Sequence, residues 1–307
     1  MSILITGING MIGYATALKF ATLGRRVIGL DIKTPCDLEK NGVQTIKADI
    51  TQADLVNDII SSCGVTSILH AGGISGPMLH KDDPYKVFLI NSYGTLNIVE
   101  AARRHGIERL VFLSTFVAYG EQTDTSVIDE SRTQRGSNAY AASKISAENI
   151  LRSYREIHKL ETISLRLGAV YGPRRKTDCL IRNLIKRSIN KEVSDLNFGK
   201  DWSRPYVYIE DILTAIQLSF EAPFSSLKQD AYNIAGGIWP TISEIADIIA
   251  NVTQTKKITL QSGRTPDDYL IGPLSIEAAQ RDLNFKPEYS MKRGIKSYYN
   301  WLQDNEF

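Results

Sequence analysis

Tyr140 and Lys144 form a pair that could carry out acid–base chemistry. They fall in a stretch with helical spacing of apolar residues, so a separation of four places both side chains on one face, about 6 Å apart. A free tyrosine has a pKa of about 10, and a neighbouring ammonium group lowers it. The pair therefore suits proton transfer to or from an alcohol or a ketone.

Two hydroxyl residues, Ser114 and Thr115, stand at the end of the apolar run 109–114, which predicts a buried strand. Doubly wound sheets bind their ligands at the carboxyl ends of the strands, so a hydroxyl there could hold a substrate oxygen. The alternative is that these hydroxyls only satisfy local backbone groups.

Three glycines follow the first apolar run, in the order Gly7-Ile8-Asn9-Gly10-Met11-Ile12-Gly13. Glycine allows a tight turn and a close approach of backbone amides to a pyrophosphate, which the N-terminus of the next helix attracts. The spacing is GxxGxxG rather than the commoner GxGxxG. The position between a predicted strand and a predicted helix favours cofactor binding over simple turn chemistry.

Asp31 ends the second predicted strand, about 20 residues beyond the glycine loop. A carboxylate there accepts hydrogen bonds from an adenosine ribose and repels the 2′-phosphate of NADP, so Asp31 predicts NAD. Lys33 leaves this preference for NAD over NADP open. Asp49 and Ile50 follow the third predicted strand, where they could flank the adenine.

The elements that must position these residues alternate between strand-like and helix-like segments in the first half of the chain. This alternation, with short connections and strongly apolar strands, predicts an α/β fold with a doubly wound parallel sheet. We predict strands over residues 2–6, 26–30, 43–46, 67–70, 109–114 and 162–167, and helices over 12–23, 55–61, 84–104 and 138–158.

The second half of the chain is punctuated by Pro and Gly and predicts a smaller, mostly C-terminal α/β subdomain that completes a cleft. Its basic cluster over residues 174–187 is interpreted first as a solvated helix face and second as an attraction for an anionic substrate. Helices are predicted over residues 180–189, 211–220, 242–252, 276–283 and 291–302.

Composition excludes several classes of protein. The 307 residues are 43% hydrophobic and 23% charged, with a net charge of +2, which gives no global field for nucleic acid or membrane binding. Three scattered cysteines and four scattered histidines indicate neither a disulfide framework nor a metal site. Without a signal-peptide pattern or about 18 consecutive apolar residues, the expected location is the cytoplasm.

The ordered set of motifs resembles the extended short-chain dehydrogenase/reductases, specifically the NAD-dependent epimerase/dehydratase family. The first part of the likeness consists of the glycine loop, Asp31, Asp49, His70-Ala71-Gly72-Gly73, Asn91, Ser114-Thr115, Tyr140 with Lys144, Leu165-Arg166 and Val170-Tyr171-Gly172-Pro173. The second part consists of residues 204–211, similar to RDFVYVxD, residues 232–235, similar to YNxG, and residues 264–267, similar to RxxD. The likeness covers nearly the whole chain and is specific to the family but not to the substrate.

The resemblance implies a fold and a role for each matching position. Residues 1–171 and about 206–237 are implied to form a Rossmann-type NAD-binding domain, and about 172–205 and 238–307 a substrate-binding subdomain. Tyr140 is the implied acid/base, Lys144 its pKa-lowering and ribose-binding partner, and Thr115 the holder of the substrate oxygen. The residues implied to bind NAD are Gly7, Asn9, Gly10, Met11, Ile12, Gly13, Asp31, Asp49, Ile50, Ala71, Gly72, Gly73, Asn91, Tyr140, Lys144, Gly168 and Val170. Those implied to bind substrate are Thr115, Phe116, Arg204 and Arg264.

Departures from the family pattern bear on the substrate. Phe116-Val117 stands where dTDP-glucose 4,6-dehydratases have an Asp-Glu pair, which argues against a dehydratase. Ala169 replaces an Asn that often contacts a nucleotide-sugar, and the segment before Arg204 is one residue shorter than in the family. Arg204 and Arg264 remain where the family binds phosphates, and would suit a carboxylate or sugar acid equally well.

We therefore expect an NAD-dependent sugar or nucleotide-sugar epimerase that oxidises a secondary hydroxyl transiently and reduces the ketone from its other face. If the ketone leaves, the same residues give a net NAD-dependent dehydrogenase of a non-nucleotide sugar acid or hydroxy acid. A third reading is an NAD-sensing binding protein, against which Thr115, Tyr140 and Lys144 argue. By analogy with the family, the helices over 87–102 and 145–154 imply a homodimer.

Overall fold

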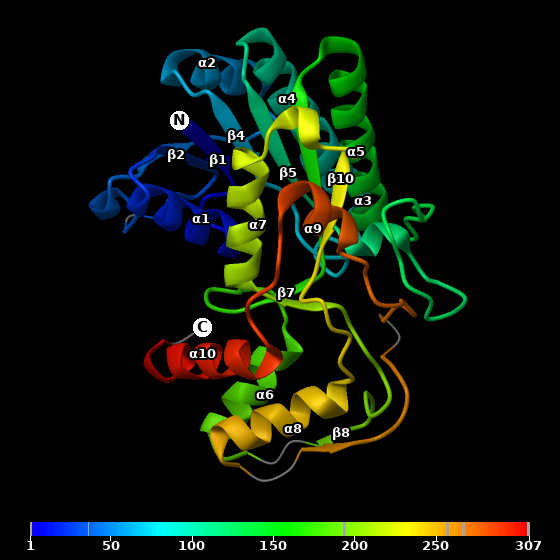
Figure 1. The fold of residues 1–307 in the computed structure, drawn as a ribbon. Helices are drawn as coiled ribbons and strands as arrows, with labels where there is room; N and C mark the ends of the chain where they lie inside the picture. Colours follow the sequence, from blue (N-terminus) through cyan, green and yellow to red (C-terminus); the bar gives the residue numbers. More distant parts are fainter. Residues whose placement is uncertain (1, 36, 193–194, 256–257, 266–267, 306–307) are drawn as a thin grey trace.

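A computed structural model of the protein describes residues 2–35, 37–192, 195–255, 258–265 and 268–305. Within these ranges, seven parallel strands form the central sheet, in the order β3-β2-β1-β4-β5-β6-β10 (Figure 1). The order reverses between β1 and β4, the switch point at which Rossmann-type folds bind dinucleotides. The predicted fold class is confirmed. The strands of this sheet are β1 (Ser2–Thr6), β2 (Arg26–Asp31), β3 (Gln44–Lys47), β4 (Ser67–His70), β5 (Arg109–Thr115), β6 (Glu161–Leu167) and β10 (Ala231–Ile234).

Helices pack against both faces of this sheet, each face with its own apolar core (Figure 1). Ile3 and Ile5 of β1 belong to one core and Leu4 to the other, because successive side chains of a strand point to opposite faces. One face holds α1 (Met11–Thr22), α7 (Ile209–Glu221) and α9 (Glu277–Leu283), and the other holds α2 (Ala53–Cys63), α4 (Gly94–Arg104) and α5 (Ala139–His158).

A second group of elements lies beyond the carboxyl ends of the strands, around a third apolar cluster (Figure 1). Its helices are α6 (Leu180–Ile189), α8 (Ile242–Thr253) and α10 (Met291–Asp304). Two parallel pairs accompany them, β7 (Ala169–Tyr171) with β9 (Tyr206–Tyr208) and β8 (Asp195–Leu196) with β11 (Thr259–Leu260). Although α9 lies between α8 and α10 in sequence, it packs against β10 of the main sheet. The division at the expected residue boundaries stays a prediction.

The helix predicted over residues 84–104 is interrupted. It consists of α3 (Pro84–Phe88), a π-helical turn η2 (Leu89–Tyr93) and then α4. A π turn widens the hydrogen-bonded loop and changes the direction of the side chains on it, and such turns are frequent at functional sites. Asn91 lies on this turn and is only 2% exposed. Short 3-10 turns occur at η1 (Glu39–Asn41), η3 (Phe116–Tyr119) and η4 (Phe224–Ser226).

A membrane-crossing helix is not found among the described residues, where none combines the required length and apolar character. In the same ranges, His, Cys, Asp and Glu side chains do not gather in a group of three that could hold a metal ion.

Candidate active site

The glycine loop connects β1 to α1 at the switch point. Gly7 has a φ of +72°, and a Cβ there would lie 2.7 Å from the carbonyl oxygen of Ala71, so only glycine fits. Gly10 is the N-cap of α1 and provides no side-chain cap, which leaves the first amides of the helix available to an anion. Met11, Ile12 and Gly13 form the first turn of this helix. The cradle therefore fits a pyrophosphate.

Asp31 is held beside this loop at the end of β2. Its carboxylate accepts the backbone N–H of Asn9 at 3.1 Å and that of Lys33 at 3.2 Å. This position suits a carboxylate that binds the adenosine ribose. Asp49 accepts the N–H of Thr51 at 2.9 Å in the turn after β3, and Ile50 beside it is buried.

Asn91 joins the segment that follows β4 to the helix that carries Tyr140. Its Oδ1 accepts the N–H of Ile74 at 2.8 Å, and its Nδ2 donates to the Ile74 carbonyl at 3.1 Å and to Ser143 Oγ at 2.9 Å. Ser143 lies on α5, next to Lys144. Asn91 thus positions the Ala71, Gly72 and Gly73 segment relative to the catalytic helix.

His70, at the end of β4, is fully buried between two threonines. Its Nδ1 lies 2.7 Å from Thr6 Oγ1, and its Nε2 lies 2.9 Å from Thr95 Oγ1. Burial, with a smaller effect of the Lys144 charge, lowers the pKa of His70 to about 3, so the ring is neutral. A neutral ring with a hydrogen-bonding partner at each nitrogen gives His70 a structural role.

Thr115 and Tyr140 meet at the carboxyl end of β5. Thr115 is the last residue of that strand, and Tyr140 lies in the first turn of α5, whose N-cap Asn138 accepts the N–H of Ala141 at 2.9 Å. Burial raises the pKa of Tyr140, whereas the hydrogen bond to Thr115 and the charge of Arg175 lower it. Thr115, implied to hold the substrate oxygen, and Tyr140, implied to be the acid/base, are therefore neighbours in the structure.

Lys144 lies one helical turn beyond Tyr140 and is also buried. Its Nζ donates to the carbonyl oxygen of Leu113 at 2.9 Å and lies 4.5 Å from the ring centroid of Phe112. Burial lowers the pKa of Lys144 to about 8, against the opposing effect of the Glu148 charge. The ammonium group is directed at the β5 backbone, and the role of Lys144 in lowering the pKa of Tyr140 stays a prediction.

A buried ion pair joins α5, the helix that carries Tyr140 and Lys144, to the neighbouring strand β6. Glu148, on α5, pairs with Arg166 of β6 at 2.7 Å, and the two side chains are 2% and 4% exposed. Glu148 also accepts the hydroxyl of Ser114, which gives Ser114 a structural role, whereas Thr115 Oγ1 accepts the N–H of Val117 at 3.2 Å. Sequence analysis missed Glu148, although its spacing of four residues from Lys144 places it on the same helix face.

A pocket of about 280 Å³ lies between the β7–β9 pair and α6. Two of the predicted positions, Arg204 and Ala169, line it together with Arg175 and Arg187. The basic cluster interpreted first as a solvated face therefore contributes two guanidinium groups to a pocket. The remaining lining residues are Asp178, Cys179, Leu180, Asn183, Leu184, Leu196, Phe198, Tyr206 and Thr265.

The two arginines implied to bind substrate converge on Asp268 at the edge of this pocket. Arg204 forms an ion pair with the Asp268 carboxylate, and Arg264 donates to the Asp268 carbonyl at 3.4 Å. Arg264 also pairs with Glu121 at 2.5 Å. The last two residues of the predicted RxxD motif, 266 and 267, lie outside the described residues.

Three further predicted positions remain: Phe116, implied to bind substrate, and Gly168 and Val170, implied to bind NAD. Phe116 packs with Tyr140 and Tyr269 in a small apolar cluster, and its implied role in substrate binding stays a prediction. Gly168 and Val170 lie where the chain leaves β6 for β7, and the Gly168 N–H donates to the Ile234 carbonyl at 2.9 Å.

The family model described as "NAD dependent epimerase/dehydratase family" matches residues 3–235, and the chain belongs to this family. A UDP-glucuronate 4-epimerase of Thermodesulfobacterium geofontis is 24% identical over 98% of this chain and 96% of its own. A putative UDP-glucose 4-epimerase of Methanocaldococcus jannaschii is 28% identical over 99% of each chain. The solved structure of a UDP-glucose 4-epimerase of Thermotoga maritima with UDP-glucose has a TM-score of 0.90 at 22% identity, with 99% of each chain covered. Family membership confirms the resemblance and the prediction of NAD as the cofactor.

Proposed function

We propose that this chain is an NAD-dependent 4-epimerase of a nucleotide-sugar. The observation that carries the proposal is the proximity of the Thr115 and Tyr140 hydroxyls, through which Thr115 lowers the pKa of Tyr140. The pair stands at the carboxyl edge of the sheet that also bears the glycine loop, and Arg175 links it electrostatically to the pocket beside β7. The full-length similarity to two relatives named as 4-epimerases of UDP-sugars supports this assignment.

In this mechanism Tyr140 removes the proton from the 4-hydroxyl of the sugar while Thr115 holds the same oxygen. The glycine loop and Asp31 would hold NAD, which when bound would supply the acceptor and then the donor of hydride. Once the sugar ring has turned, Tyr140 returns the proton to the carbonyl oxygen. The two hydroxyl residues are 6% and 8% exposed, so bulk water is kept from the reacting oxygen.

The pocket favours a substrate that carries phosphates. Arg175, Arg187 and Arg204 line it, and guanidinium groups bind phosphate oxygens in a bidentate fashion. Leu196 and Phe198 add an apolar wall suited to a base. These side chains offer contacts to a nucleotide-sugar even though Ala169 replaces an Asn that often makes such a contact.

The test is incubation of the NAD-loaded enzyme with UDP-glucose, UDP-glucuronate and UDP-N-acetylglucosamine, with NMR detection of the 4-epimers. We expect a 4-epimer from at least one substrate and no net formation of NADH. Stoichiometric NADH with a released ketone would overturn the proposal in favour of the dehydrogenase. Tyr140→Phe should lower turnover by about 10²–10⁴-fold and leave NAD binding intact.

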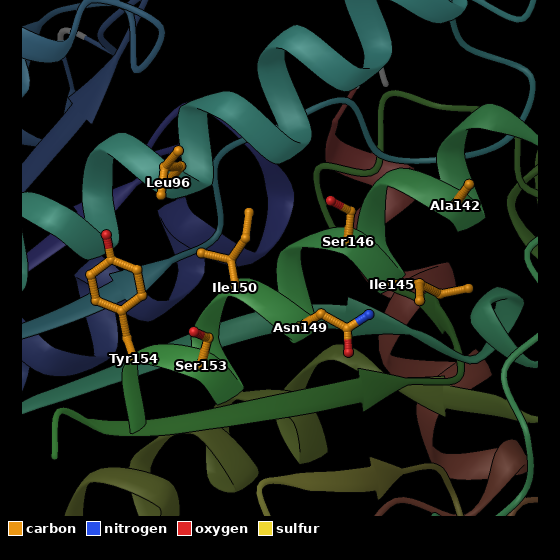
Figure 2. A pocket seen from close by; sticks show the side chains of 8 residues that line it. All are labelled: Leu96, Ala142, Ile145, Ser146, Asn149, Ile150, Ser153 and Tyr154. Carbon is orange, nitrogen blue, oxygen red and sulfur yellow. The ribbon is translucent and has the colours of Figure 1, made fainter. Parts of the chain in front are cut away.

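We also propose that two copies of the chain associate through α4 and α5. A groove of about 570 Å³ runs between these helices, with Leu96 on α4 and Tyr154 on α5 at one end (Figure 2). Small side chains at Ala142, Ser146 and Ser153 would allow a partner helix to approach closely. Light scattering after size-exclusion chromatography should give twice the chain mass of 34.2 kDa, and a single-chain mass would contradict the proposal.

A further inference from the structure

Residues 174–176 form a basic strap between β7 and α6, and its side chains diverge. The middle residue, Arg175, stays on the substrate side, where it bonds the Val170 carbonyl and donates to the Asp178 carbonyl at 2.9 Å. Arg174 and Lys176, on either side of it, extend toward the glycine loop and helix α1. The strap therefore links the substrate pocket to the glycine loop.

Lys176 reaches the glycine loop itself. Its Nζ lies 3.3 Å from Asn9 Oδ1 and 3.4 Å from the Asn9 carbonyl oxygen. Asn9 directly precedes Gly10, the N-cap of α1, and its N–H donates to the Asp31 carboxylate. The ammonium group thus lies at the place where the helix N-terminus attracts a pyrophosphate.

Arg174 attaches the strap to helix α1, which follows the glycine loop. Its guanidinium carbon lies 3.6 Å from the ring centroid of Tyr14, within the range of a cation–π contact. The Tyr14 hydroxyl in turn donates to Asp37 at 2.5 Å. Arg174 has a φ of +63°, a backbone conformation that a non-glycine residue adopts at a cost. The contacts of Arg174 with Tyr14 and of Lys176 with Asn9 therefore hold the strap beside the glycine loop.

We propose that Lys176 is a cofactor-binding residue whose ammonium group contacts the pyrophosphate of NAD, so that the strap slows release of the cofactor. Among the described residues, both hydrogen bonds of Lys176 go to neutral oxygens of Asn9, which leaves its charge for an anionic ligand. Lysine serves this purpose as a flexible point charge. The inference rests on NAD binding by the family and not on the identity of the sugar.

The experiment measures NAD release from the loaded enzyme. Protein carrying radiolabelled NAD is mixed with excess unlabelled NAD, and the bound label is followed over time. We expect Lys176→Met to release NAD about fivefold faster at low ionic strength, a difference that salt reduces, and Lys176→Arg to behave like wild type. Lys228→Met, which removes an exposed lysine before β10 at the other end of the sheet, is the matched control.

Binding of ADP and adenosine separates a phosphate contact from support of the loop. ADP contains the pyrophosphate and should bind more weakly to Lys176→Met, whereas adenosine should bind equally to both proteins. An unchanged rate of NAD release in Lys176→Met would overturn the proposal. An equal loss of adenosine affinity would also overturn it, because Lys176 would then only maintain the shape of the loop.

Discussion

Lys144 carries its charge at a cost in folding free energy, and Lys144→Met tests the size of that cost. The residue is 6% exposed, and burial lowers its pKa from 10.5 to about 8. At about 1.4 kcal/mol per pH unit, this difference amounts to about 3 kcal/mol in favour of the unfolded state when the lysine is charged.

The pH dependence distinguishes this cost from the loss of packing. Below about pH 8 the lysine is charged in both states, and the folded protein bears the full cost. Between about pH 8 and 10.5 the folded protein releases the proton and the unfolded chain keeps it, so the free energy of unfolding rises with pH. Met lacks this titration and loses the bond to the Leu113 carbonyl at every pH.

The assay is urea-induced unfolding of the NAD-free wild type and Lys144→Met across this pH range. We expect the stability of wild type relative to the variant to increase by about 3 kcal/mol from pH 7 to pH 10.5. Lys228→Met is the control for the loss of one positive charge at the surface. A stability difference between wild type and Lys144→Met that does not change with pH would refute the reasoning.

Four further substitutions, in three experiments, test other parts of the site. In Gly7→Ala the new Cβ would lie 2.7 Å from the Ala71 carbonyl oxygen, so the free energy of unfolding should fall by about 1–3 kcal/mol and NAD binding should weaken. Unchanged NAD titration and thermal unfolding would contradict this. Glu148→Met should destabilise the protein by about 3–5 kcal/mol because it leaves Arg166 buried and unpaired, and adding Arg166→Met should restore most of the loss in urea unfolding. Losses that simply add would show that the two charges are not coupled. Thr115→Val should raise the pKa of Tyr140 by removing a hydrogen bond that lowers it, and so move the rising limb of the kcat–pH profile to higher pH; an unmoved limb would be the contrary result.

Local chemistry made the cofactor cradle predictable. The turn at Gly7 and the helix that begins at Met11 are set by residues adjacent in sequence, and Asp31 follows from the order of strands at the switch point. The pair of Thr115 and Tyr140 was recovered from motif order, which stands in for the long-range packing of β5 and α5.

Features that depend on distant contacts were not predictable. The π turn around Asn91 leaves the apolar pattern of an ordinary helix intact, so the sequence shows no break. The three-residue strands β7 and β9 are too short for a periodic signal. The different roles of Arg175 and Lys176 could not be predicted, because the two are adjacent basic residues. Only their contacts, of Arg175 with Val170 and of Lys176 with Asn9, direct their side chains to different parts of the site.

The chain segments that connect the main sheet to the α6–α8–α10 group form backbone hydrogen bonds with each other. The Gly168 N–H donates to the Ile234 carbonyl at 2.9 Å, that of Ala169 to the Pro205 carbonyl at 2.8 Å, and that of Gly236 to the Tyr206 carbonyl at 3.1 Å. Rigid rotation of one group away from the other would break this set of bonds together. These amides should therefore exchange hydrogen with solvent only when the whole fold opens.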